Sequence, residues 1–332
     1  MITPKLCYLG QPLFLFIITM FSLVIGVANA EVWVSPIEKK YNTEYPELYK
    51  KYNKAKNILN SHSGYQKDLM IAEKLLAEIL SKQSNFSPAY REYGRLYIKA
   101  GYLYNHEFRS GTLSSAETTI LEAIRLEPNY ADAYVLLGHL YTLRKDYPRA
   151  EKFLKIAEKI GTSLPWLHLN FADLLKYQGK RKQSLIRYMT VIDSDTNNKS
   201  AYSSALRSVA EHYQLEKNFK KADYWYHKLI EFDPTAWNLG GYSNYLLFWK
   251  GDADNSIEYG EKAIATMNYG IGRFNLACAY YTKWIQISAT QGKKEAKQYF
   301  ERAHNLYPNI EGIVNELSKY RATEKAAIFS RP

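Results

Sequence analysis

The stretch NYADAYVLLGHLYTLRKDYPRAEKFLKIAEKI, residues 129–160, decides the fold. Large residues recur in its first half at intervals of three and four, with Gly138 among them, and after the polar turn LRKDYPR the same spacing joins Ala150, Leu154 and Ala157. Residues three and four apart share one face of a helix. The stretch therefore predicts two antiparallel helices, in which Gly138 and Ala150 are small because the two backbones approach closely there.

The same spacing returns along the whole chain. Counted from Ser87, every position of the pattern is matched if the turn GYLYNHEFRS, residues 101–110, is an insertion. Self-similarity at this period indicates a stack of similar units instead of one enlarged core. The predicted division is a linker at 31–44, a degenerate hairpin at 45–86, hairpins at 87–130, 131–164, 165–202, 203–236, 237–269 and 270–308, and a capping helix with a tail at 309–332.

The pattern resembles the tetratricopeptide repeat, a helical hairpin of about 34 residues. The resemblance implies an all-α fold, a right-handed superhelical solenoid of stacked antiparallel hairpins with a capping helix at its C-terminal end. Strand signals are nearly absent, and Pro128, Pro234 and Pro308 stand where second helices are expected to end.

The first thirty residues have a different composition. An apolar run, Leu13–Ile25, follows Lys5 and leads to the small residues Ala28 and Ala30 around Asn29. This pattern is typical of a secretory signal peptide cleaved after Ala30, so the protein is expected in the periplasm or outside the cell. The alternative is a membrane anchor formed by residues 13–27, the one way in which membrane contact is expected, although the apolar run is shorter than the ~20 residues that a spanning helix needs.

Charge and cysteine content limit the partners. The formal net charge is +11, and the lysines are spread over many segments. An exported protein seldom meets nucleic acid, so we expect solvated helix surfaces and no nucleic-acid partner, with an acidic polysaccharide as an alternative partner. Cleavage leaves Cys278 as the one cysteine, which excludes an internal disulfide and is expected to pack on its helix.

Residues that carry catalysis show no known arrangement. The seven histidines lack the HExxH zinc spacing, no paired cysteines form a zinc ribbon, and no serine stands in a GxSxG turn. A glycine-rich phosphate loop is also missing from the sequence. We therefore expect no enzymatic activity, no metal site and no cofactor.

Binding residues follow from the resemblance. In tetratricopeptide repeats, positions 2, 5, 9, 12 and 13 of the first helix tend to face the concave groove. Exposed aromatic residues in such a groove are common anchors of a binding site. The matching positions here are a basic patch of Arg91, Arg95 and Lys99, an aromatic patch of Tyr245, Phe248, Trp249, Phe274 and Tyr281, and, between them, Trp166 and Arg207.

Each patch has an alternative interpretation. The aromatic residues could pack between helices, and the basic residues could be merely solvated. Some members of the family grip a C-terminal carboxylate with an Asn at position 9 of a first helix. None of the units counted here has Asn at that position, so we do not expect this mode of peptide capture.

These features predict a non-catalytic scaffold that binds a partner protein, or a segment of one, in the groove of the solenoid. The expected setting is an envelope assembly, secretion or cell-wall system. The alternative is a carbohydrate-associated module for exopolysaccharide export or binding, because aromatic faces stack on sugars. Many of the 30 tyrosines, however, are the large residues of the repeat, as Tyr134 and Tyr141 are. An enzyme is the third interpretation.

Overall fold

The fold is all-α. The computed structural model describes residues 33–62, 64–103, 107–194 and 196–321. The chain divides into two units, Met1–Glu31 and Val32–Pro332. The first unit, which contains the predicted signal peptide, lies outside the described residues, as do the middle of the expected insertion and the end of the tail. The described residues form sixteen α-helices, one π-helical turn and no β-strand.

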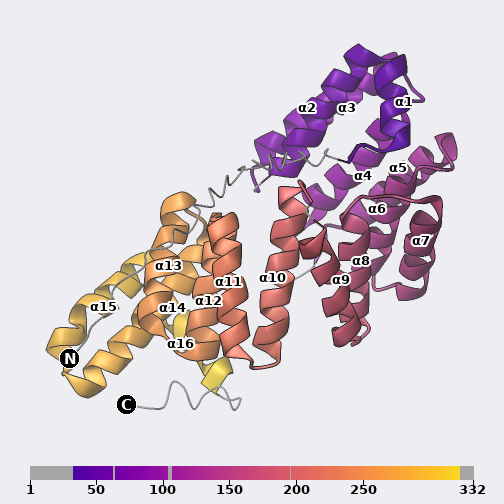
Figure 1. The fold of residues 1–332 in the computed structure, drawn as a ribbon. Helices are drawn as coiled ribbons and strands as arrows, with labels where there is room; N and C mark the ends of the chain where they lie inside the picture. Colours follow the sequence, from indigo (N-terminus) through magenta and orange to yellow (C-terminus); the bar gives the residue numbers. More distant parts are fainter. Residues whose placement is uncertain (1–32, 63, 104–106, 195, 322–332) are drawn as a thin grey trace, which may run out of the picture. The chain divides into compact units, whose positions relative to one another are not determined.

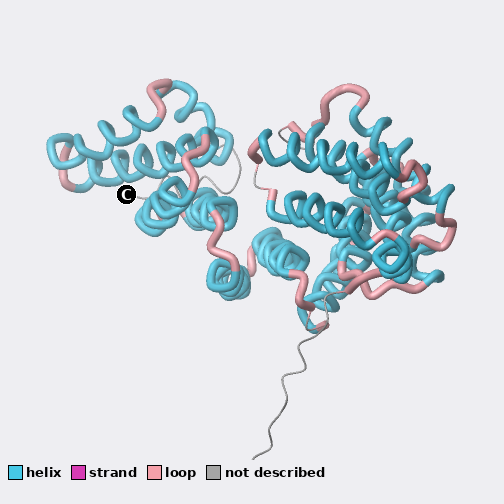
Figure 2. Tube along the Cα trace, turned by 90° about the horizontal axis from the view of Figure 1, so that it is seen from above, coloured by secondary structure: helices cyan, strands magenta, loops and turns pink. Residues whose placement is uncertain are grey.

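Seven helical hairpins follow one another along the chain, and each packs on the next (Figure 1). Short loops join the helices (Figure 2). The all-α solenoid of stacked hairpins expected from the sequence is thereby confirmed. The hairpins are α2 (Pro46–Ser61) with α3 (Gln66–Lys82), α4 (Ser87–Gly101) with α5 (Thr112–Leu126), α6 (Ala131–Leu143) with α7 (Tyr147–Ile160), α8 (Trp166–Tyr177) with α9 (Arg181–Asp193), α10 (Lys199–Leu215) with α11 (Phe219–Phe232), α12 (Ala236–Tyr245) with α13 (Ala253–Thr266), and α14 (Gly270–Thr290) with α15 (Lys293–Leu306).

One further helix stands at each end of the stack. Helix α16 (Ile310–Arg321) packs on α14 and buries Ile313 and Leu317, at the place where a capping helix was expected. Helix α1 (Pro36–Glu44) packs on α2 and α4. It lies within residues 31–44, so the prediction of a linker there is wrong for Pro36–Glu44, which form a helix. Ser35 caps α1, since its Oγ accepts a hydrogen bond from the Glu38 N–H at 3.1 Å.

Small residues let the two helices of a hairpin cross closely. A Cβ atom on Gly138 would lie 2.6 Å from the Leu154 side chain, and Ala150 beside it is fully buried. In the hairpin of α8 and α9, Ala172 takes the place of the glycine, and Ser184 Oγ donates to the Ala172 carbonyl at 2.7 Å. The small residues of the pattern thus set the distance between paired helices.

The hairpin of α12 and α13 contains one extra residue. The two small residues that meet in the α8–α9 hairpin are 12 positions apart. Their counterparts here, Ser243 and Ser256, are 13 apart, and each hydroxyl donates to the other residue's carbonyl, at 2.7 and 2.9 Å. The π-helical turn η1 (Leu246–Lys250) continues α12 and takes up this residue.

The extra residue changes the register of the repeat. Because Ser243 occupies position 8, the unit begins at Ala236 and not at Trp237, and Asn244 stands at position 9. The expectation that no unit carries Asn at position 9 is therefore wrong. The cause is physical: spacing in a sequence reveals an insertion in a loop more readily than one hidden in a continuous helix.

We predict that Ala150→Leu lowers the free energy of unfolding by about 1–3 kcal/mol, because the larger side chain overpacks the crossing of α6 and α7. Thermal melting followed by circular dichroism measures the effect. Ala77→Leu, at an exposed position of α3, is the matched control and is expected to leave the melting temperature unchanged. Equal melting of both variants would contradict the close crossing.

Candidate functional site

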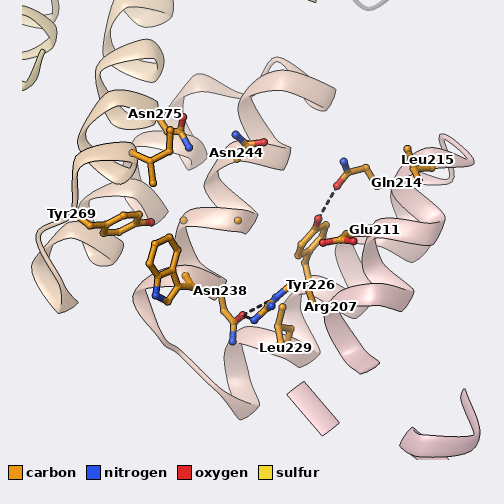
Figure 3. A pocket seen from close by; sticks show the side chains of 14 residues that line it. Arg207, Glu211, Gln214, Leu215, Tyr226, Leu229, Asn238, Asn244, Tyr269 and Asn275 are labelled. Carbon is orange, nitrogen blue, oxygen red and sulfur yellow. Dashed lines mark hydrogen bonds between the residues drawn. The ribbon is translucent and has the colours of Figure 1, made fainter. Parts of the chain in front are cut away.

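A pocket of about 390 Å³ opens between the hairpin of α10 and α11 and the first helices of the next two hairpins, α12 and α14. Its walls combine a guanidinium, several amides and three aromatic rings (Figure 3). The lining residues are Arg207, Glu211, Gln214, Leu215, Tyr226, Leu229, Trp237, Asn238, Gly240, Gly241, Asn244, Tyr269, Ile271 and Asn275.

Arg207 is held in the wall by an amide. Its Nε donates to Asn238 Oδ1 at 3.1 Å, and its Nη2 donates to the same oxygen. Asn238 is buried, and its Nδ2 donates to the Asp233 carboxylate at 2.8 Å, which fixes the direction in which the amide oxygen points. Within the described residues Arg207 forms no ion pair with a carboxylate. The pocket therefore presents a positive charge that has no anionic partner.

Trp237 and Tyr269 form an aromatic wall of the same pocket. Trp237 is 47% exposed, and its ring lies against that of Tyr269, with centroids 4.6 Å apart. The Tyr269 hydroxyl donates to the Ala236 carbonyl at 3.2 Å. Gly240 makes this approach possible, because a Cβ atom there would lie 2.2 Å from the Tyr269 hydroxyl. The Trp237 ring is thereby packed against Tyr269 and remains open to the pocket.

Gly241 has no structural reason to be glycine. No heavy atom lies within 4 Å of the position that its Cβ would take, and the residue is exposed in the middle of α12. Glycine inside a helix costs roughly 0.5–1 kcal/mol relative to alanine. The missing side chain leaves open space on the surface of α12 where the helix lines the pocket.

Two amides beside this space have no partner. Asn244 lies three residues beyond Gly241 on α12, and Asn275 reaches the same pocket from α14 (Figure 3). Neither side chain makes a hydrogen bond to another described residue. A side-chain amide offers two donors and an acceptor, so both can pair with the N–H and C=O groups of an extended peptide or with sugar hydroxyls.

The other polar groups of the pocket are already paired. The Glu211 carboxylate forms an ion pair with Lys176 at 3.1 Å, and the Tyr226 hydroxyl donates to Gln214 Oε1 at 2.6 Å. Burial raises the pKa of Tyr226, so its hydroxyl stays neutral. Arg207, Asn244 and Asn275 are therefore the groups that can recognise a ligand.

The predicted aromatic patch does not form an exposed surface. Tyr245 and Phe248 are each 1% exposed. The corrected register moves Tyr245 away from position 9, whereas Phe248 is covered by α16. Phe248 stacks on Tyr320 of α16 at 4.2 Å, and Phe274 packs against Tyr307 at 4.8 Å. The remaining predicted aromatic residues, Trp166, Trp249 and Tyr281, are partly buried against core clusters. Of the ten predicted residues, only Arg207 lines the pocket.

The predicted basic patch lies on one face of α4 but is largely covered. Arg91 is 6% exposed and forms an ion pair with Glu92. Arg95 Nη1 reaches the same carboxylate at 2.7 Å, and its Nη2 donates to Asn60 at 2.7 Å. Burial and then the charge of Arg95 lower the pKa of Lys99 to about 8. The alternative that these residues are merely solvated is therefore wrong for Arg91 and Arg95, and the prediction that the patch binds a partner stays a prediction.

Sequence reasoning missed Trp237, Gly241, Asn244 and Asn275. The sequence did contain one signal of this site. Two adjacent glycines, Gly240 and Gly241, lie inside a predicted helix, where glycine lowers helix propensity and usually has a packing or functional reason. In the described part of the chain, no three His, Cys, Asp or Glu side chains converge as a metal would require. No helix there has the length and hydropathy of a membrane span.

Lys99 gives a pH-dependent prediction. Its pKa is about 8 in the folded chain and about 10.5 when unfolded, so between these values the unfolded chain binds more protons and stability rises with pH. We expect wild-type stability to gain about 2 kcal/mol over Lys99→Met between about pH 7.5 and 9.5, since the ionisation of other groups affects both chains equally. Urea unfolding at several pH values measures this, and Lys67→Met, at an exposed lysine, should show no such difference.

Comparison with known proteins supports the repeat assignment. The sequence profile described as "Tetratricopeptide repeat" matches residues 119–152, from the middle of α5 to the start of α7. No curated protein matches the sequence significantly.

Solved structures share the fold at low identity. Yeast Tom70 superposes with a TM-score of 0.52 and 17% identity, over 78% of this chain and 52% of that chain. The APC/C hetero-tetramer Cut9-Hcn1 gives 0.52 and 14%, over 72% and 48%, and Pseudomonas aeruginosa pilF gives 0.51 and 13%, over 72% and 99%. This chain thus spans about half the length of the first two matched chains, and the likeness concerns the fold alone.

Proposed function

We propose that this chain, which is a tetratricopeptide repeat protein, is a non-catalytic scaffold that binds an extended segment of a partner protein in the pocket of α10, α11, α12 and α14. The observation that carries the proposal is a set of groups around the open space at Gly241: one guanidinium with no ion-pair partner and two amides with no hydrogen-bond partner among the described residues. The amides suit a peptide backbone, and Arg207 suits an acidic side chain or a terminal carboxylate.

The setting follows from the sequence. The apolar run before Ala30 favours export, so we propose that the scaffold works in the periplasm or outside the cell, within an envelope assembly, secretion or cell-wall system. No residue of the pocket has the arrangement of a nucleophile with its base, and a binding role needs none. Arg207, which has no ion-pair partner among the described residues, favours partners with acidic segments.

A carbohydrate is the second candidate ligand, and Trp237 is the observation that favours it. Its exposed face, backed by Tyr269, could stack on a sugar ring while Asn244 and Asn275 bind hydroxyls. An acidic polysaccharide would in addition meet Arg207. Titration with polygalacturonate, an acidic polysaccharide, followed by fluorescence of the tryptophans separates this candidate from a protein partner.

The experiment that tests the proposal is photo-crosslinking in cells. A benzophenone amino acid replaces Leu215, which lines the pocket and is 41% exposed, or replaces Met70 on α3, which is 62% exposed and distant in sequence. A protein adduct specific to position 215 supports the scaffold. Adducts that are equal at both positions, or that contain glycan without peptide, contradict a protein segment as the ligand of this pocket.

Gly241→Leu provides a sharper prediction. Leucine favours a helix over glycine by roughly 0.8 kcal/mol, so the melting temperature should stay equal or rise. The side chain fills the open space, and we expect the yield of the adduct at position 215 to fall about tenfold, which is about 1.4 kcal/mol of binding free energy. Ala265→Leu, at an exposed position of α13, is the control. An unchanged adduct in a stably folded Gly241→Leu chain would count against the pocket.

A further inference from the structure

Helix α1 inserts a carboxylate into a basic face of the solenoid. Glu38 is 1% exposed. Its oxygens accept hydrogen bonds from Tyr52 at 2.7 Å, from Lys56 at 2.7 Å and from Tyr130 at 3.2 Å. These donors belong to α2 and to the residue that precedes α6, so a single side chain of α1 connects two hairpins that are far apart in the sequence.

The face beneath α1 holds more positive than negative charge once Glu38 is set aside. Lys56, Arg91 and Arg95 stand against Glu92 and Asp132. Arg91 and Asp132 occupy the fifth position of α4 and the second position of α6, which in this repeat face the groove. Helix α1 therefore lies at groove positions of the second and third hairpins, and its carboxylate pairs with Lys56 of the first hairpin.

The fit of α1 is incomplete. Arg91 is 6% exposed, and its buried Nε has no hydrogen-bond partner among the residues that the structure describes. An unpaired buried donor costs roughly 1–3 kcal/mol. A segment that supplied one more acceptor at this place would satisfy the whole guanidinium, which α1 does not.

Helix α1 is attached to the hairpins through a small number of side chains and one short connection. A helix of nine residues is too short to be stable by itself. Apart from Glu38, its segment is held by Trp33 Nε1 donating to Asp132 at 3.2 Å, by the Tyr41 hydroxyl donating to the Asn85 carbonyl at 2.8 Å, and by the exposed pair Lys40–Glu127. The Tyr41 ring also packs on Phe86 with centroids 4.8 Å apart, and Ile37 packs against the core beside it. Tyr45 alone separates α1 from α2, and rotation about its backbone would move α1 as a unit.

We propose that the face beneath α1 is a second binding site, for an acidic helical segment of a partner protein, and that α1 is the resident occupant that such a segment displaces. The site is separate from the pocket at Arg207 and does not depend on its function. The ligand class follows from the charges: a short amphipathic helix with one carboxylate directed at Lys56 and Arg91 and with apolar residues where Ile37 and Tyr41 now lie.

The test uses the full chain and a labelled peptide of residues 33–45 as the probe. Glu38→Lys places a positive charge against Lys56 and should release α1, whereas Glu44→Lys, at an exposed position of the same helix, should not. We expect the probe to bind the Glu38→Lys chain about tenfold more tightly than the wild type or the Glu44→Lys chain. A probe with Gln in place of Glu38, or the added change Lys56→Ala, should lose this gain.

Hydrogen exchange reports the state of α1 in the same samples. Fast exchange of residues 36–44 with protected α2 and α4, together with probe binding, supports the proposal. Fast exchange without probe binding overturns it, and so does protection of α1 equal to that of α2 in the Glu38→Lys chain. Trp33→Ala, which weakens a different contact of the same segment, must give the same result.

Two further outcomes also decide the question. If both release variants lose the helical content of the solenoid, α1 is part of the core and the proposal fails. If size-exclusion chromatography shows that release produces dimers, the occupant is α1 of a second copy and not a partner protein. Arg207→Ala should leave probe binding unchanged, so failure here is distinguishable from failure of the pocket.

Discussion

The close crossing of two helices at small residues is the contact on which the rest of the structure depends. Gly138 against Leu154 and Ala172 against Ser184 hold the two helices of a hairpin at a fixed separation. The large residues then project away from the crossing and fill the space between one hairpin and the next, as Leu137 and Tyr141 do. Stability in such a stack comes from each hairpin and its interfaces with neighbours.

The sequence predicted this architecture because small and large residues repeat at spacings that only paired helices explain. The hairpin of α6 and α7 follows from the opening stretch almost residue by residue. The binding face was harder to predict, because it depends on the absolute register of each helix. One residue hidden in the π-helical turn moved Tyr245 into the core and turned Asn244 toward the pocket, and α16 covers Phe248.

The sequence also did not reveal which helix faces are covered by other segments of the chain. Arg91, Arg95 and Lys99 do share one face of α4, as their spacing of four predicts. No pattern within α4 shows that α2 pairs with Arg95 through Asn60 or that α1, from a segment predicted to be a linker, lies at the N-terminal end of α4. The buried acid Glu38 and the N-cap at Ser35 are the local features that could have identified α1, since a serine followed by proline is a common helix start.

The long-range contacts of α1 have a consequence for the order in which the chain folds. Contacts between successive hairpins are local, whereas Glu38 bonds to Tyr130 across 92 residues and Trp33 to Asp132 across 99. A chain that is synthesised or exported from its N-terminal end exposes α1 before these partners exist. The first described helix is thus among the last to reach its place, and during that interval its acidic side chain and apolar face are open to whatever meets the nascent chain.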